Sequence, residues 1–299
     1  MNKINSLIIS KQDIISALTF YNITDKLYIT KCYDCLESIV TNPNWVARFN
    51  EVYKTLYLDG LDRAKIKELW ASKTIEDLFW KSCHPFTTNL LLLSGYNKHI
   101  KNMNKYNLDN IQKKLHIKRV NEALTSDVFF RNFPGIRIIK MLWGAYFINI
   151  RIIEVGRLQY ELCFHNPINS SIQETCVKIH IPEGDKLYID DVKNSIINSR
   201  IYIYKYFAMK NLNYYCISWL LSPELNEIID RNSNIYKFYK LFKITSSNND
   251  ATSDILEFVF KLQECDNYNM LPETTSLQKA LKTMLITNKP LSIGVGLLK

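Results

Sequence analysis

The segment from Thr175 to Ile189, TCVKIHIPEGDKLYI, constrains the fold of this chain most strongly. Alternating β-forming residues open it, a Pro-Glu-Gly-Asp turn at 182–185 interrupts it, and a helical pattern follows. This order predicts a strand, a tight turn and the beginning of a helix. Such a junction directs backbone N–H groups and the positive end of a helix dipole to one point, which suits a pyrophosphate or a carboxylate. An ordinary strand-to-helix connection that binds nothing is the alternative.

The chain around this segment alternates between helical and extended patterns. The predicted helices are one that begins at Phe133-Pro134-Gly135, then 190–207, 222–229 and 277–285. The predicted strands are 151–164, 175–181, 214–221, 236–244, 255–260 and 291–295, with a polar loop over 245–254. This order indicates an α+β or mixed α/β layer, with a mixed sheet flanked by helices, rather than an all-parallel doubly wound sheet.

The first 125 residues have a helical pattern. Ser10 to Asp13 and Thr74 to Asp77 both fit a capping box, and an apolar run follows each of them. Because 299 residues suffice for two ordinary domains, we predict a helical domain over residues 1–125 and a second domain over 126–299.

Composition favours a soluble globular protein, with 47% hydrophobic and 22% charged residues. No apolar run approaches the roughly 20 residues that cross a bilayer, and the N-terminus lacks the pattern of a signal peptide, so we expect no transmembrane segment and a cytoplasmic location. The seven cysteines are irregularly spaced, and the CxxC at Cys32 and Cys35 lacks a second ligand pair at zinc spacing. We therefore predict free thiols and no metal.

The net charge of +9 is concentrated in one segment. Lys98 to Arg119 holds seven basic residues and a single acid, Asp109. Such a segment can serve nucleic acid, an anionic membrane, a phosphate-bearing cofactor or an acidic protein, and a solvated helix face is the plain alternative. Without an RNP-type aromatic signature or helix-turn-helix spacing, we expect no nucleic-acid partner. A non-catalytic module that holds an acidic protein or nucleic acid stays open as the alternative function.

Five short segments carry a resemblance to a known family. They are VGRLQYE at 155–161, HIPEG at 180–184, SWLLSPEL at 218–225, SNI at 233–235 with Phe238 and Phe242, and Leu271-Pro272 followed by TSLQK at 275–279. In this order they resemble the acyltransferase-domain proteins, which join a helical N-acyltransferase N-terminal domain to a GNAT-like C-terminal domain. The resemblance implies transfer of an acyl group from a thioester to an amine. Some similar proteins look like maturases that place fatty acyl chains on peptides, which implies a small molecule or a peptide as acceptor.

The donor implied by the resemblance is a thioester of coenzyme A or of an acyl carrier protein. The usual pyrophosphate loop of the GNAT superfamily is a Gln/Arg-x-x-Gly-x-Gly/Ala run, whereas here the turn holds only Gly184. Fewer glycines leave fewer places where backbone approaches a phosphate closely. An acyl carrier protein therefore remains the second possible donor and partner.

Attack of an amine on a thioester requires a base, and the departing thiolate is helped by a donor. His180 ends the strand before the turn, and histidine without perturbation ionises near pH 6.5. Glu161 shares one side of its strand with Gln159, and it is the second candidate base if that side faces the cleft rather than solvent. Ser218 is a candidate hydrogen-bonding partner for the thioester carbonyl or the amine. Each of the three also fits an ordinary structural place in a sheet.

The candidate donor-binding residues lie mostly in the turn. They are Ile181, Glu183, Gly184, Asp185 and Lys186, with Trp219 as a wall of the acyl channel and Arg157 as a partner for a phosphate or a substrate carboxylate. A strand arginine can equally pair with an acid across the sheet.

Overall fold

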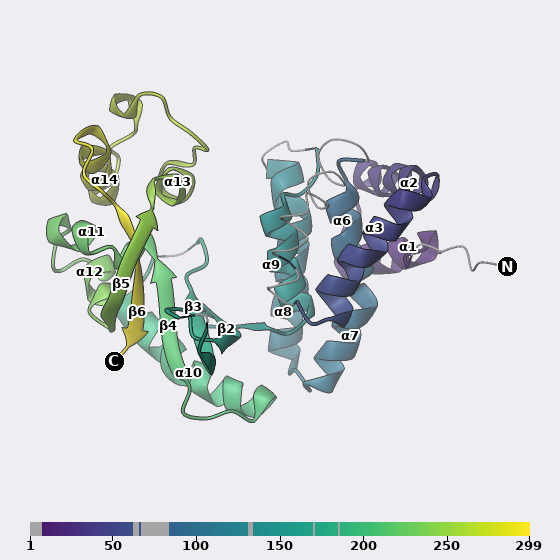
Figure 1. Ribbon diagram of the computed structural model, residues 1–299, viewed down its shortest axis with the longest axis horizontal. Coiled ribbons are helices and arrows are strands. Elements are labelled where there is room, and N and C mark those ends of the chain that lie inside the picture. The colour runs from purple at the N-terminus through teal and green to yellow at the C-terminus, as the bar shows by residue number, and fades with distance from the viewer. Residues whose placement is uncertain (1–7, 62–65, 67–83, 131–133, 170, 185) are drawn as a thin grey trace. The chain divides into compact units, whose positions relative to one another are not determined.

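The computed structural model describes residues 8–61, 66, 84–130, 134–169, 171–184 and 186–299 (Figure 1). The chain divides into two compact units, Met1–Ile153 and Glu154–Lys299. The division falls after α9 (Ile138–Ile148), the helix that the sequence assigned to the second domain. Met141 and Phe147 of α9 are fully buried in one core with the N-terminal helices, which explains why α9 belongs to the first unit.

The first unit is helical, as predicted. Its other helices are α1 (Lys11–Phe20), α2 (Lys26–Val40), α3 (Pro43–Tyr53), α6 (Thr87–Ser94), α7 (Tyr96–Lys105) and α8 (Asn110–Thr125), with π-helical segments at Lys54–Leu58 and Ser126–Phe130. The capping box of Ser10 and Asp13 begins α1 as expected. The second predicted box, at Thr74, lies outside the described residues. Cys32 and Cys35 are buried thiols of α2 that form no disulfide, and burial raises the pKa of Cys32 to about 12.

A histidine lies at the centre of this helical core. The side chain of His99 is fully buried, and its Nδ1 lies 3.0 Å from the hydroxyl of Tyr21. Its Nε2 has no hydrogen-bond partner among the described residues. Burial therefore lowers the pKa of His99 well below its ordinary value, and the nearby His116 lowers it further.

The helical unit is expected to lose stability as the pH falls below about 6.5, the pKa of histidine in an unfolded chain. Below about pH 6.5 the histidine binds a proton in the unfolded chain but not in the folded protein, where it is buried. The contribution of neutral His99 to the free energy of unfolding is therefore complete above about pH 6.5 and decreases as the pH falls below it. The slope for one such group is about 1.4 kcal/mol per pH unit. Urea unfolding at pH 7 and pH 5 gives the free energy of unfolding at each pH. The difference between the two values should be smaller in His99→Gln than in wild type. An equal slope in wild type and variant would contradict the assignment.

The second unit is built on a six-stranded sheet in the order β1-β2-β3-β4-β6-β5. The strands are β1 (Ile152–Val155), β2 (Leu158–His165), β3 (Gln173–His180), β4 (Asn213–Ser218), β5 (Phe242–Asp250) and β6 (Ser292–Leu298). β3 and β4 are parallel, whereas β2 with β3, β4 with β6 and β5 with β6 are antiparallel. The predicted mixed sheet flanked by helices is confirmed.

Helices flank the sheet and fill the connections. They are α10 (Ile189–Phe207), α11 (Pro223–Ile228), α12 (Asn234–Tyr239), α13 (Thr252–Ile255) and α14 (Ser276–Ile286), with 3₁₀ turns at Trp219–Leu221 and Tyr268–Met270 and a π-helical segment at Leu256–Phe260. α10 lies along the face of the sheet that carries Tyr160, whose hydroxyl is 2.7 Å from Ser195 Oγ of α10 (Figure 1). Among the described helices of both units, none is long and apolar enough to cross a membrane.

Three predictions for the C-terminal region are wrong. Residues 236–244 were expected as one strand, but Ser233 caps a helix there by accepting from the backbone N–H of Tyr236, and β5 begins only at Phe242. The expected polar loop over 245–254 is largely the edge strand β5, which backbone pairing with β6 holds despite its polar side chains. The expected strand 255–260 is helical, since Ile255, Leu256 and Phe260 pack into a core with α14.

Candidate functional site

The strand-turn-helix junction forms as the sequence predicts. β3 ends at His180, and α10 begins at Ile189. Gly184 has φ of +137°, a conformation that other residues rarely adopt, and it faces open space. Glu183 is exposed and forms an ion pair with Lys261, while Ile181 is half-buried. Asp185 lies outside the described residues.

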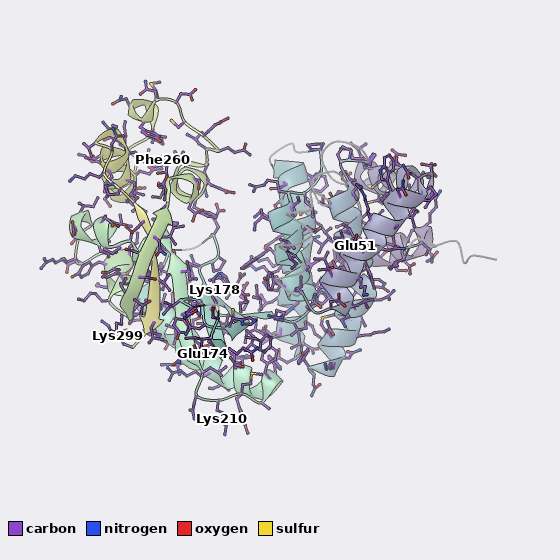
Figure 2. The ribbon with its side chains drawn as sticks, viewed as in Figure 1. Glu51, Glu174, Lys178, Lys210, Phe260 and Lys299 are labelled. Carbon is purple, nitrogen blue, oxygen red and sulfur yellow. The ribbon has the colours of Figure 1, made fainter. Side chains whose placement is uncertain are left out.

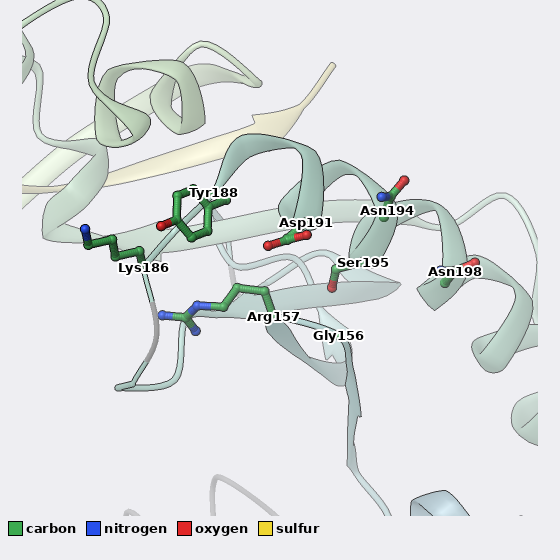
Figure 3. A pocket seen from close by; sticks show the side chains of 8 residues that line it. All are labelled: Gly156, Arg157, Lys186, Tyr188, Asp191, Asn194, Ser195 and Asn198. Carbon is green, nitrogen blue, oxygen red and sulfur yellow. The ribbon is translucent and has the colours of Figure 1, made fainter.

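A hollow of about 580 Å³ opens beside this junction (Figure 3). Its lining residues are Gly156, Arg157, Lys186, Tyr188, Asp191, Asn194, Ser195 and Asn198. Arg157 comes from the β1–β2 turn, where Gly156 has positive φ, and its Nη1 donates to the carbonyl of Pro182 at 2.8 Å. This bond ties the two turns together. Arg157 and Lys186 extend toward the same end of the hollow, so two cations from separate turns meet there.

The beginning of α10 also faces this hollow. Tyr188 occupies the N-cap position, and its side chain makes no capping hydrogen bond. The first N–H groups of a helix have no intrahelical acceptor, so they are available to an anion. Asp190 and Asp191 lie in the same first turn, and Asp191 lines the hollow. Its carboxylate disfavours an anion close to it, so in this hollow the negative charge of Asp191 opposes the positive charges of Arg157 and Lys186.

His180 and Glu161 form a hydrogen-bonded pair. Nε2 of His180 lies 2.8 Å from Oε2 of Glu161, and the side chain of the histidine is 18% exposed while that of the glutamate is 2% exposed. The register between β2 and β3 places His180 opposite Gln159, and Glu161 opposite Lys178, which is labelled in Figure 2. His180 and Glu161 are therefore diagonal neighbours on one face of the sheet. The buried carboxylate thus orients an imidazole that reaches the surface. With the proton on Nε2, the basic lone pair is on Nδ1.

A second carboxylate lies on the neighbouring strand. Glu154 of β1 is buried, and its Oε2 accepts a hydrogen bond of 2.7 Å from Nε2 of Gln159. Gln159 and Glu161 share one side of β2, as predicted, and this side is buried rather than solvated. Glu154 was missed in the sequence, although a lone acid inside the apolar run Ile152 to Val155 was a usable signal.

The structure places Ser218 and Trp219 at the end of β4. Ser218 Oγ accepts from the backbone N–H of Leu220, so the hydroxyl caps the 3₁₀ turn that Trp219 begins. Pairing between β3 and β4 runs only to Ile179 opposite Cys216, whereas Ser218 still pairs with Gly294 of β6. The two parallel strands therefore separate just before His180 and Ser218. Alternation along the strands puts these two side chains on opposite faces of the sheet.

No group of three or more histidine, cysteine, aspartate or glutamate side chains suited to a metal ion occurs in the part of the chain that the structure describes.

Comparison with known families identifies the second unit. Residues 152–298 match the family model described as the GNAT-like C-terminal domain, so this part of the chain is a GNAT-like domain, as the resemblance predicted. None of the curated proteins matches the sequence.

Several solved structures of acyltransferases have a similar fold. One, an acyltransferase mutant in complex with octanoyl-CoA, aligns with a TM-score of 0.70 at 17% identity, over 96% of this chain and 88% of the other. Another, in complex with decanoyl-CoA, aligns with a TM-score of 0.62 at 21% identity, over 71% of this chain and 65% of the other. A complex with decanoyl-CoA and teicoplanin aligns with a TM-score of 0.61 at 20% identity, over 72% and 66%. The chain thus has the fold of a GNAT-like acyltransferase.

Proposed function

We propose that this protein is an N-acyltransferase that moves an acyl group, including a fatty acyl group, from a coenzyme A thioester to an amine. The observation that carries the proposal is the pair of His180 and Glu161, placed where β3 separates from β4. A partly exposed imidazole backed by a buried carboxylate is an arrangement suited to general base catalysis. It supports His180 as the base and Glu161 as the residue that orients it.

In the proposed reaction the neutral amine attacks the carbonyl carbon of the thioester. A C–N bond forms, the amine loses a proton to Nδ1 of His180, and the C–S bond breaks to release the thiolate of coenzyme A. Ionised Glu161, which accepts the hydrogen bond from Nε2, stabilises the imidazolium that results. The proton then passes to the thiolate or to solvent, which restores neutral His180. The proposal gives Ser218 no proton transfer, because its hydroxyl caps the turn at Leu220.

The coenzyme A donor is proposed from two features of the sheet and its edge. The separation of β3 from β4 exposes strand backbone to the amide groups of a pantetheine arm, with Trp219 at the β4 side. Arg157, Lys186 and the first N–H groups of α10 offer positive charge and donors to the phosphates. Similar folds have been solved with decanoyl-CoA and octanoyl-CoA bound, which supports the same donor here.

Combined replacement of Arg157 and Lys186 by alanine is expected to weaken the binding of decanoyl-CoA by about tenfold or more, since each removes a charge-assisted contact to phosphate. Asp191→Asn should change the affinity in the opposite direction, because it removes a carboxylate from the same hollow. Isothermal titration calorimetry gives the dissociation constant of decanoyl-CoA for wild type and for these two variants.

The matched control is Lys113→Glu with Lys114→Glu, in the basic segment that the sequence offered to an acyl carrier protein. Neither lysine lines the hollow, so this double reversal should leave decanoyl-CoA binding unchanged. Weakening by the control but not by the Arg157 and Lys186 variant would instead place the phosphates of coenzyme A at the basic segment, and it would contradict the assignment of the hollow.

The acceptor is proposed to be an amine of a small molecule or of a peptide. A similar fold has been solved with teicoplanin, which supports a peptide-like acceptor without fixing its identity. We place the reaction in the cytoplasm, a reducing compartment in which the described cysteines stay as free thiols.

A further inference from the structure

The outward face of α10 carries a stripe of exposed apolar residues. Ile197 is 60% exposed, Ile201 62% and Tyr204 50%. Their spacing of four and then three residues places all three on one side of the helix, opposite the buried side that holds Val192, Ile196 and Ile203. Single exposed apolar residues are ordinary, but three at the repeat of a helix-packing seam form a continuous strip.

Cations border this strip on both sides. Lys193 and Arg200 occupy positions that border one side of the strip, and Lys205 a position that borders the other, as residues beside the apolar seam of a coiled coil do. The guanidinium of Arg200 lies 5.7 Å from the ring centre of Tyr214, and the ammonium of Lys205 lies 5.1 Å from that of Tyr206. The ammonium group of Lys210, labelled in Figure 2 beyond the end of α10, lies 4.1 Å from the ring centre of Tyr204. From residue 192 to residue 212 the sequence contains no acid. Asp190, in the first turn, lies seven residues before Ile197 on the same side of the helix. From Lys193 onward this face of α10 is therefore apolar at its centre, with basic residues at the bordering positions.

We propose that this face of α10 docks an acidic amphipathic helix of a partner protein. An apolar seam with basic edges matches a helix whose own seam is apolar and whose flanking residues are glutamate or aspartate, because such pairs select the partner in coiled coils. A second copy of the same face is a poor occupant, since cations on both edges repel their equivalents. A strip one residue wide is also narrower than the apolar face of a helix that lies in a bilayer surface. The proposal concerns binding and does not depend on the proposed reaction.

The probe is a designed helical peptide with leucine at the seam positions and glutamate at the flanking positions, labelled for fluorescence polarisation. Full-length wild-type protein should bind it, with an affinity that falls as salt is added. Arg200→Glu with Lys205→Glu should weaken binding about tenfold or more, because attraction at two edges becomes repulsion. Ile201→Glu should do the same by placing a charge in the seam. The control, Lys243→Glu with Lys289→Glu, makes the same change in charge at exposed lysines outside α10 and should bind like wild type.

A charge-swapped peptide with lysine at the flanking positions provides the sharpest comparison. It should bind the Arg200 and Lys205 reversal variant better than it binds wild type. Failure of wild type to bind the glutamate peptide, or equal weakening by the Lys243 and Lys289 control, would overturn the proposal. A third result would also overturn it. If the peptide does not bind, and wild type sediments with phosphatidylglycerol vesicles while the reversal variant does not, the face binds a membrane instead.

Discussion

Replacement of His180 by alanine is expected to lower the rate of acyl transfer by about 10²–10⁴-fold, the usual loss when a general base is removed. The reason is geometric. His180 is the imidazole that stands at the separation of β3 from β4, and Glu161 fixes its orientation through a bond of 2.8 Å. In the proposed reaction the variant lacks the imidazole that takes the proton of the attacking amine.

The measurement is the rate of amide formation from saturating decanoyl-CoA, with the dissociation constant of the donor and the melting temperature measured on the same samples. Both of these controls should stay close to wild type, since His180 is proposed to act on the amine rather than to hold the donor. Unchanged transfer by a folded His180→Ala protein would show that the histidine is structural.

Glu161→Gln is expected to lower the same rate by about 10- to 100-fold, which is less than the effect of His180→Ala. The glutamine keeps the shape of the side chain but removes the charge-assisted hydrogen bond to the imidazolium, a loss of about 1.5–3 kcal/mol. Because Glu161 acts only through His180, the double variant should be no slower than His180→Ala alone. Additive losses in the double variant would mean that the two residues act independently.

The local pattern of the sequence was sufficient for the centre of the sheet. The alternation of Gln159 and Glu161, the turn at Gly184 and the helix after it all have short-range signals, and the structure places them as expected. The burial of Glu161 and its bond to His180 depend on the register between β2 and β3, which are joined through residues 166–172. Register is a long-range property that a single sequence does not specify.

The errors near the C-terminus have a related cause. Residues 245–250 are polar and read as a loop, yet hydrogen bonds from β6 make them a strand. Most residues from Ile255 to Phe260 are β-forming, yet the segment is helical and packs in one core with Leu281 and Leu285 of α14. In both segments tertiary contacts outweigh local propensity. Arg157 and Lys186 were both named from the sequence as donor-binding candidates, but their position beside one hollow required the fold, because the residues come from separate turns.

A single-turnover experiment with decanoyl-CoA and a panel of primary amines tests the central claim most directly. Mass spectrometry would follow the acyl product and free coenzyme A for wild type and His180→Ala side by side. The expected result is an amide formed in equal amount to free coenzyme A, with its rate lowered at least about 10²-fold in the variant. Consumption of decanoyl-CoA without any amide, or equal rates of amide formation in the two proteins, would contradict acyl transfer to an amine by His180.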